Sequence, residues 1–121
     1  MSKKVLVVDD DTHTNDLVSE TLKLEGYEVV QVGSGEEALA LLETTSVDLI
    51  LLDLLLPGMR GWKLAEELKK NPKTKSIPIV VISILSPEDT EMGKENPSVI
   101  GYVCKPFDLN VLVQEVKKHA A

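Results

Sequence analysis

Short unbroken apolar runs alternate along the chain with segments in which apolar residues recur every three or four positions. The runs predict buried strands at residues 4 to 9, 28 to 32, 47 to 53, 77 to 83 and 100 to 104. Strands that are apolar on both faces are typical of parallel sheets with helices on each side. The pattern therefore predicts an α/β fold, a doubly wound five-stranded parallel sheet flanked by five helices.

The predicted helices carry recognisable start and stop residues. In the first helix the inward positions are expected to be Leu17, Val18, Thr21, Leu22 and Leu24. Gly26 supplies its stop. Ser34 and Glu37 form a capping-box pattern ahead of the second helix, the third is predicted at residues 62 to 70, and Asp108 is expected to cap the last.

The segment between the fourth and fifth predicted strands is a weaker helix candidate than the others. Pro87 could open a helix there, but Gly93 and Pro97 limit it to about two turns. Met92 is its only large apolar residue before Val99, so little apolar surface is available to dock it. We therefore expect the fourth helix to be short or irregular.

Length, charge and cysteine content narrow the class of protein. A chain of 121 residues is about one domain, expected to span residues 1 to 121. The formal net charge of −7 argues against direct nucleic-acid binding, which needs clustered Lys and Arg. Cys104 is the only cysteine, and neither a leader nor a membrane-spanning segment is recognisable. We expect a cytoplasmic protein without membrane association.

Charged residues stand where three of the predicted strands end. Asp9 ends the first strand and Asp10 and Asp11 follow it, Asp53 ends the third, and Lys105 follows the fifth. Ligands of open parallel sheets bind beyond the carboxyl ends of the strands. The sequence therefore predicts a charged functional site at that edge.

Four motifs in this order carry a resemblance to a known family. They are VVDDD at 7 to 11, DLLLPGMRG at 53 to 61, VVIS ending at Ser83, and YVCKPF at 102 to 107. Together they resemble the receiver domain of two-component response regulators, the CheY-like family. The resemblance covers the whole chain and implies a flavodoxin-like sheet with strand order 2-1-3-4-5.

That strand order would bring three carboxylates into one crevice. The first and third strands would be neighbours about 4.8 Å apart, so Asp9, Asp10 and Asp53 would converge and repel one another. An all-oxygen pocket without paired His or Cys suits Mg²⁺. The resemblance implies that Asp10 binds Mg²⁺ directly, that Asp9 binds it through water, and that the backbone carbonyl of Leu55 is a further ligand.

The resemblance also implies how the site works. Asp53 would accept a phosphoryl group from a phosphohistidine of a sensor histidine kinase or histidine phosphotransfer protein. Lys105, aimed inward by a cis bond before Pro106, would stabilise the transferred group. Ser83 and Tyr102 would be switch residues. The chain would be a signalling domain that assists its own phosphorylation and dephosphorylation, not an enzyme, and would contact a downstream protein through its fourth helix, fifth strand and fifth helix.

Three residues depart from the family pattern. Ile84 follows Ser83 where the family usually has Ala or Gly, and it would narrow the approach to Asp53. Leu55 is apolar where many members are polar, and we hypothesise that it shields a long-lived acyl phosphate from water. Arg60 replaces an Asp, which suggests a different ion pair or partner contact.

Several other functions fit parts of the sequence. Residues 33 to 38 match G-x-G-x-x-A of dinucleotide sites, but Glu36 and Glu37 would repel a pyrophosphate at that helix start. A haloacid-dehalogenase-like phosphatase needs a second acid where this chain has Leu55. The main alternative is a non-phosphorylated pseudo-receiver that acts as an interaction module, for which Ile84 is the best argument. The sequence leaves open whether the chain acts alone or within a longer protein.

Overall fold

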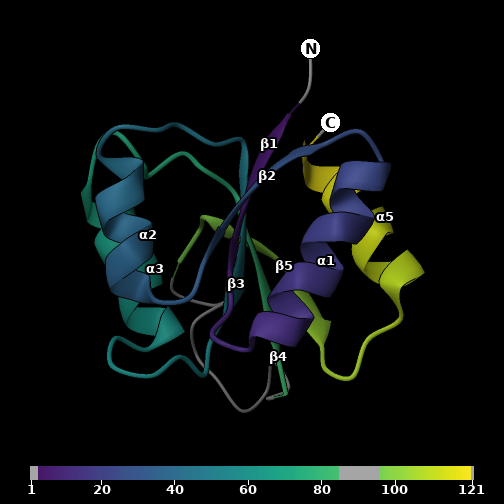
Figure 1. The fold of residues 1–121 in the computed structure, drawn as a ribbon. Coiled ribbons are helices and arrows are strands. Elements are labelled where there is room, and N and C mark those ends of the chain that lie inside the picture. The colour runs from purple at the N-terminus through teal and green to yellow at the C-terminus, as the bar shows by residue number, and fades with distance from the viewer. Residues whose placement is uncertain (1–2, 85–95, 121) are drawn as a thin grey trace.

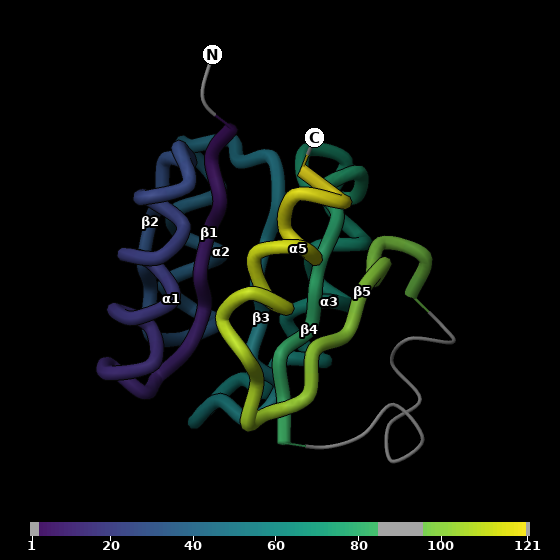
Figure 2. The backbone as a smooth tube through the Cα atoms, turned by 90° about the vertical axis from the view of Figure 1, so that its right-hand side faces the viewer, coloured from purple at the N-terminus to yellow at the C-terminus, as the bar shows by residue number. Residues whose placement is uncertain are grey.

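The computed structural model describes residues 3–84 and 96–120, which form one parallel sheet between two layers of helices (Figure 1). The strands are β1 (Lys4–Val8), β2 (Glu28–Val32), β3 (Leu49–Asp53), β4 (Ile79–Ser83) and β5 (Val99–Cys104). They pair in the order β2-β1-β3-β4-β5, and every pair is parallel. Figure 2 shows β2 and β5 at opposite edges. The implied strand order is therefore confirmed.

Four helices are present in the described part of the chain. They are α1 (Thr12–Leu24), α2 (Gly35–Leu42), α3 (Gly61–Lys70) and α5 (Leu109–Ala120). The helices α1 and α5 cover one face of the sheet, and α2 and α3 cover the other (Figure 1). The predicted fourth helix falls on residues 85–95, outside the residues that the structure describes.

Two apolar clusters lie on opposite faces of the sheet. They explain why the strand sequences are continuous apolar runs. In β1, Leu6 and Val8 belong to the cluster with residues of α2 and α3, while Val5 and Val7 belong to the cluster with residues of α1 and α5. All four side chains are fully buried. Burial of such a side chain stabilises the fold by about 1.5–3 kcal/mol, so both faces must be apolar.

Side chains and glycine set the helix ends at the predicted places. Gly26 ends α1 with φ of 98°, a conformation that residues with a Cβ rarely adopt. The Ser34 hydroxyl accepts a hydrogen bond from the backbone N–H of Glu37 at 3.1 Å, as the capping box requires. Asp108 accepts one from the backbone N–H of Asn110 at 2.7 Å. These three boundaries are confirmed.

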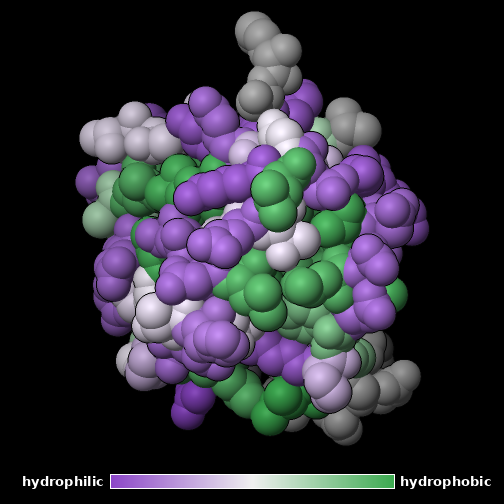
Figure 3. All heavy atoms as spheres, turned by 45° about the vertical axis from the view of Figure 1, so that its right-hand side comes forward, coloured by the Kyte–Doolittle hydropathy of each residue, from purple (hydrophilic) through white to green (hydrophobic). Residues whose placement is uncertain are grey.

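The buried face of α1 differs from the prediction. Leu17 and Leu24 are 44% and 87% exposed, whereas Asn15 and Ser19 are buried with Val18 and Leu22. Hydrophobic residues accordingly reach the surface among hydrophilic ones on the side that carries α1 and α5 (Figure 3). The prediction failed because a hydrophobicity pattern treats every polar residue as exposed, while Asn15 bonds to carbonyl groups at the strand ends and Ser19 bonds to Asn15.

A bulge in β5 is the second feature that the pattern did not reveal. Val99 pairs with Ile79, but the next β4 residue, Val80, pairs with Gly101, so Ile100 is an extra residue in the strand. The strand β5 starts at Val99, one residue earlier than predicted, and the bulge after Val99 places Val99 and Tyr102 against the same apolar cluster. Strict alternation along the strand would have put these two side chains on opposite faces.

Candidate functional site

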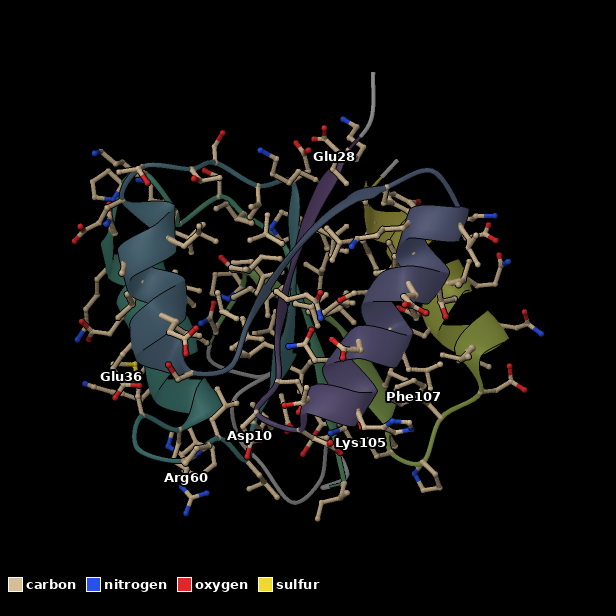
Figure 4. The ribbon with its side chains drawn as sticks, in the orientation of Figure 1. Asp10, Glu28, Glu36, Arg60, Lys105 and Phe107 are labelled. Carbon is tan, nitrogen blue, oxygen red and sulfur yellow. The ribbon has the colours of Figure 1, made fainter. Side chains whose placement is uncertain are left out.

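The predicted site residues gather at the carboxyl edge of the sheet. Asp9 follows β1, Asp53 and Ser83 are the last residues of β3 and β4, and Lys105 follows β5. Asp10 and Lys105 lie at this edge, the lower one in Figure 4, and Glu28 lies at the other end of the sheet. The parallel strands bring these residues together from positions up to 96 apart in sequence.

Three carboxylates share the centre of this edge. Asp9, Asp10 and Asp53 each offer an oxygen, and these oxygens all lie within 4.8 Å of one another. Asp9 is 1% and Asp53 6% exposed, while Asp10 faces solvent. The site therefore has a buried floor formed by two strand ends and an open side at Asp10, and the predicted convergence is confirmed.

The Lys105 ammonium bridges the two buried carboxylates. Its Nζ lies 3.2 Å from Asp9 Oδ2 and 3.0 Å from Asp53 Oδ2. Burial by itself would lower the pKa of Lys105, but the hydrogen bonds and negative charges of Asp53 and Asp9 outweigh it and raise the pKa above its usual value. The lysine therefore stays cationic near neutral pH. The Lys105–Pro106 peptide bond is cis, as expected.

One ammonium does not fully compensate Asp9. Burial is the main reason why the pKa of Asp9 is raised, and the charge of Asp53 raises it further. The hydrogen bond from the Asp11 backbone and the nearby Lys105 act in the opposite direction but do not cancel the rise. Keeping Asp9 ionised in the folded protein therefore costs free energy, and a second cation nearby would reduce that cost.

Backbone groups orient both buried carboxylates in the same way. The N–H of Asp11 donates to Asp9 Oδ1 at 2.9 Å, and the N–H of Leu55 donates to Asp53 Oδ1 at 3.1 Å. In each case the hydrogen-bonded N–H belongs to the residue two positions further along, and the second oxygen faces Lys105. The turns after β1 and β3 thus fix the direction of the two acids.

The donor set fits a hard divalent cation. Within the described residues this group offers carboxylate oxygens only, which suit Mg²⁺ or Ca²⁺ and not a metal that prefers nitrogen or sulfur. Opposite ligands of an octahedral Mg²⁺ are about 4 Å apart, a separation compatible with this cluster. An open hollow of about 320 Å³, lined in part by Asp9, Asp10 and Glu37, lies beside the cluster.

The two predicted switch residues occupy the neighbouring strands. Ser83 is fully buried, and its carbonyl accepts a hydrogen bond from the Lys105 N–H at 2.8 Å, which joins the ends of β4 and β5. Tyr102 is half-buried against the cluster on the α2 and α3 face. Ile84 is exposed directly after Ser83.

Two residues that shape the site were not predicted. A Cβ on Gly61 would lie 2.5 Å from the carbonyl oxygen of Asp53 and 2.6 Å from Leu54 Cα, so α3 begins in direct contact with the end of β3. Asn15 donates hydrogen bonds from Nδ2 to the carbonyl oxygens of Asp9 and Val32, each at 3.0 Å. Asn15 carries no sequence signal, because an asparagine in an amphipathic helix is expected on the solvent side.

Comparison with known proteins agrees with this geometry. Residues 5–117 match the response regulator receiver domain family. The chemotaxis response regulator CheY4 of Vibrio cholerae has a solved structure that superposes with a TM-score of 0.91 at 32% identity, covering 98% of each chain. The chain therefore belongs to the response regulator receiver family, and its domain is a signalling domain of two-component systems.

Two curated relatives are longer than this chain. The phosphate regulon transcriptional regulatory protein PhoB of Pseudomonas aeruginosa is 32% identical over 97% of this chain and 51% of its own length. The DNA-binding dual master transcriptional regulator RpaA of a Synechocystis strain is 32% identical over 94% of this chain and 47% of its own length. The chain thus spans about half the length of these relatives.

None of the helices in residues 3–84 and 96–120 is long and apolar enough to cross a membrane.

Proposed function

We propose that this chain is a phosphoacceptor receiver, with residues 1–121 acting as one domain. Asp53 accepts a phosphoryl group from a phosphohistidine on a sensor histidine kinase or histidine phosphotransfer protein. The observation that carries the proposal is the Lys105 ammonium bridging Asp9 and Asp53 beside solvent-facing Asp10. It supports the proposal because the carboxylate that would be the nucleophile lies beside a cation and beside carboxylate oxygens that could hold a metal.

The proposed reaction is a group transfer between nitrogen and oxygen. A carboxylate oxygen of Asp53 forms a bond to phosphorus while the P–N bond of the phosphohistidine breaks, and its electron pair returns to the imidazole nitrogen. The product is an acyl phosphate. The Leu55 N–H holds Asp53 Oδ1, and Lys105 already lies beside Oδ2, where it can stabilise charge on the phosphoryl oxygens.

The metal in this proposal is Mg²⁺. Asp9, Asp10, Asp53 and the backbone carbonyl of Leu55 would hold it, with Asp9 acting through water. Bound Mg²⁺ would supply charge neutralisation to the phosphoryl oxygens. The raised pKa of Asp9 supports the site, because burial and the charge of Asp53 outweigh Lys105 there, and a second cation would offset them.

Phosphorylation acts on partners through a population shift. A phosphoryl group that contacts both Ser83 and Lys105 in only one arrangement stabilises that arrangement. The Ser83 carbonyl and the Lys105 N–H already join β4 to β5, so a movement at Ser83 reaches the strand that carries Tyr102. The output is a changed contact with a downstream protein at β5 and α5, in a cytoplasmic setting. With a net charge of −7, this chain favours a protein target over DNA.

The deciding experiment is phosphorylation by a small phosphodonor. Acetyl phosphate with Mg²⁺ should add one phosphoryl group to the wild-type chain, read as a shift in intact mass. The shift should vanish in Asp53→Asn and in excess chelator, and persist in the matched control Asp48→Asn. Asp48 lies just before β3, at the opposite end of that strand from Asp53. A wild-type chain that never gains mass would identify a non-phosphorylated interaction module.

Leu55 is expected to extend the lifetime of the phosphoform. Its side chain is apolar and half-buried next to Asp53, where it would limit the approach of attacking water. Loss of the phosphoryl group, followed by mass after the donor is removed in the presence of Mg²⁺, should be several-fold faster in Leu55→Asn. Unchanged loss, or rapid loss from the wild type, would contradict the shielding role.

A further inference from the structure

Asn15 is a buried polar residue whose hydrogen-bonding groups are all engaged. Asn15 is 5% exposed, and its Nδ2 donates hydrogen bonds to two backbone carbonyl oxygens, each at 3.0 Å. Its Oδ1 accepts hydrogen bonds from Ser19 Oγ at 3.2 Å and from Gln31 Nε2 at 2.9 Å. A side-chain amide has two donors and one oxygen with two lone pairs, so none of this capacity is left over.

The two donor bonds of Asn15 join three elements at the site edge. One goes to the carbonyl of Asp9, directly after β1, and the other to the carbonyl of Val32, the last residue of β2. The N–H of Asp9 also donates to the Val32 carbonyl at 3.2 Å. The α1 side chain therefore closes a ring with the ends of β1 and β2.

We propose that Asn15 is a positioning residue for the metal site. Its amide holds the peptide group between Asp9 and Asp10, so the carboxylates on either side of that group point toward Asp53. The inference rests on the proposed magnesium-dependent function and adds a residue of α1 to its machinery. A buried carbonyl that loses its donor turns toward another one or toward water, and such a turn would rotate both acids.

The two sides of the Asn15 amide allow a matched test. Asn15→Leu removes the donors with a bulkier side chain that branches at the same atom, and Asn15→Ala removes them with a smaller one. Ser19→Ala deletes a bond to the acceptor side in the same buried network but leaves the bonds to Asp9 and Val32 in place. The control therefore separates positioning of the acids from general weakening of α1.

Magnesium affinity is the first readout. Isothermal titration calorimetry on fully folded protein should give a dissociation constant for Mg²⁺ about tenfold or more weaker in Asn15→Leu and Asn15→Ala, as for other residues that orient metal ligands. In Ser19→Ala it should stay within about twofold of wild type. Urea unfolding checks that each variant is folded. All three substitutions can change the free energy of unfolding, so that quantity does not test the positioning role.

Backbone amide shifts provide a readout that needs no metal. In the metal-free protein, the amide resonances of Asp9, Asp10 and Asp11 should move in both Asn15 variants and remain near wild type in Ser19→Ala. Equal effects of Ser19→Ala and Asn15→Leu on affinity and shifts, or no effect of either Asn15 variant, would overturn the positioning role. If the wild-type chain binds no Mg²⁺, the function proposed above is wrong. The amide shifts alone would then test whether Asn15 positions Asp9 and Asp10.

Discussion

Asp9 and Lys105 show how burial and charge compete at a single residue. Burial raises the pKa of the Asp9 carboxyl, and the ammonium of Lys105, 3.2 Å away, offsets this rise only in part. Lys105 shares its charge between two carboxylates, since Asp53 is 3.0 Å from the same nitrogen. In the metal-free protein, the charged form of Asp9 is therefore electrostatically destabilised.

This destabilisation gives Asp9→Asn a stability effect with a definite pH dependence. The pKa of Asp9 is raised above 3.8 in the folded chain, so the stability that Asp9 contributes is present below 3.8 and lost as pH rises through the folded value. The substitution should therefore stabilise the metal-free protein near pH 7, by an amount that declines as the pH falls toward 3.8.

Urea unfolding in chelator, run on both proteins at several pH values, measures this difference. Comparison of the variant with wild type cancels the titrating groups that do not interact with Asp9, including Asp11, whose pKa is lowered chiefly by the hydrogen bond from Thr14. A variant that is less stable than wild type at neutral pH would show that the pairing with Lys105 outweighs burial.

At the level of elements, the junction of β3 and α3 determines where Asp53 sits. Gly61, the first residue of α3, donates its N–H to the Leu54 carbonyl at 2.9 Å and lies against the Asp53 backbone. This contact fixes the helix directly on the strand end that carries the acid. Arg60 precedes it as the N-cap and makes no side-chain capping bond.

Gly61→Ala should disturb this junction. The added Cβ would meet backbone atoms at 2.5 and 2.6 Å, which cannot move without shifting β3 or α3. Overpacking of this kind costs about 1–3 kcal/mol in the free energy of unfolding. Gly33→Ala is the matched control, because its Cβ would meet only a Glu37 side-chain oxygen at 3.8 Å. Equal unfolding midpoints for the two variants would disprove the close contact.

Arg60→Ser should strengthen the start of α3. A serine at the N-cap can accept a hydrogen bond from the backbone N–H groups of the first turn, and it removes a positive charge from the positive end of the helix dipole. We expect a gain of about 0.5–2 kcal/mol over Arg60→Ala, which removes the charge without adding a cap. Thermal or urea unfolding of the two variants measures the gain, and equal stabilities would show that the serine does not cap.

For the whole molecule, the site joins parts of the sheet that are remote in sequence. Asp9 follows β1, Asp53 ends β3 and Lys105 follows β5, so a cation held by the acids ties the strand ends together. A ligand that binds only the folded state stabilises it in proportion to the logarithm of its concentration. The proposed metal binding would therefore be linked to folding.

Mg²⁺ should stabilise the wild type against urea, by about 2.7 kcal/mol at a concentration 100 times its dissociation constant. Asp10→Asn should remove most of this gain, and it should change the stability in chelator little because Asp10 faces solvent. Full retention of the magnesium effect in Asp10→Asn would place the ion at another site.

The sequence by itself determined the alternation of strands and helices, most helix ends and the presence of charged residues at the carboxyl edge. These features depend on local periodicity and on side chains that bond within a few residues, as Ser34 does with Glu37. The prediction that Asp9, Asp10, Asp53 and Lys105 lie together is also confirmed, because parallel strands bring their carboxyl ends to the same edge.

Only the tertiary structure decided which polar groups the interior would accept. The burial of Asn15, the bulge at Ile100 and the contact of Gly61 with Asp53 depend on neighbours supplied by other strands. The same holds for the balance of charge at Asp9, because its ammonium partner lies 96 residues away. Local sequence encodes the tendency to form each element, whereas desolvation and hydrogen-bond satisfaction are defined only once the elements are packed together.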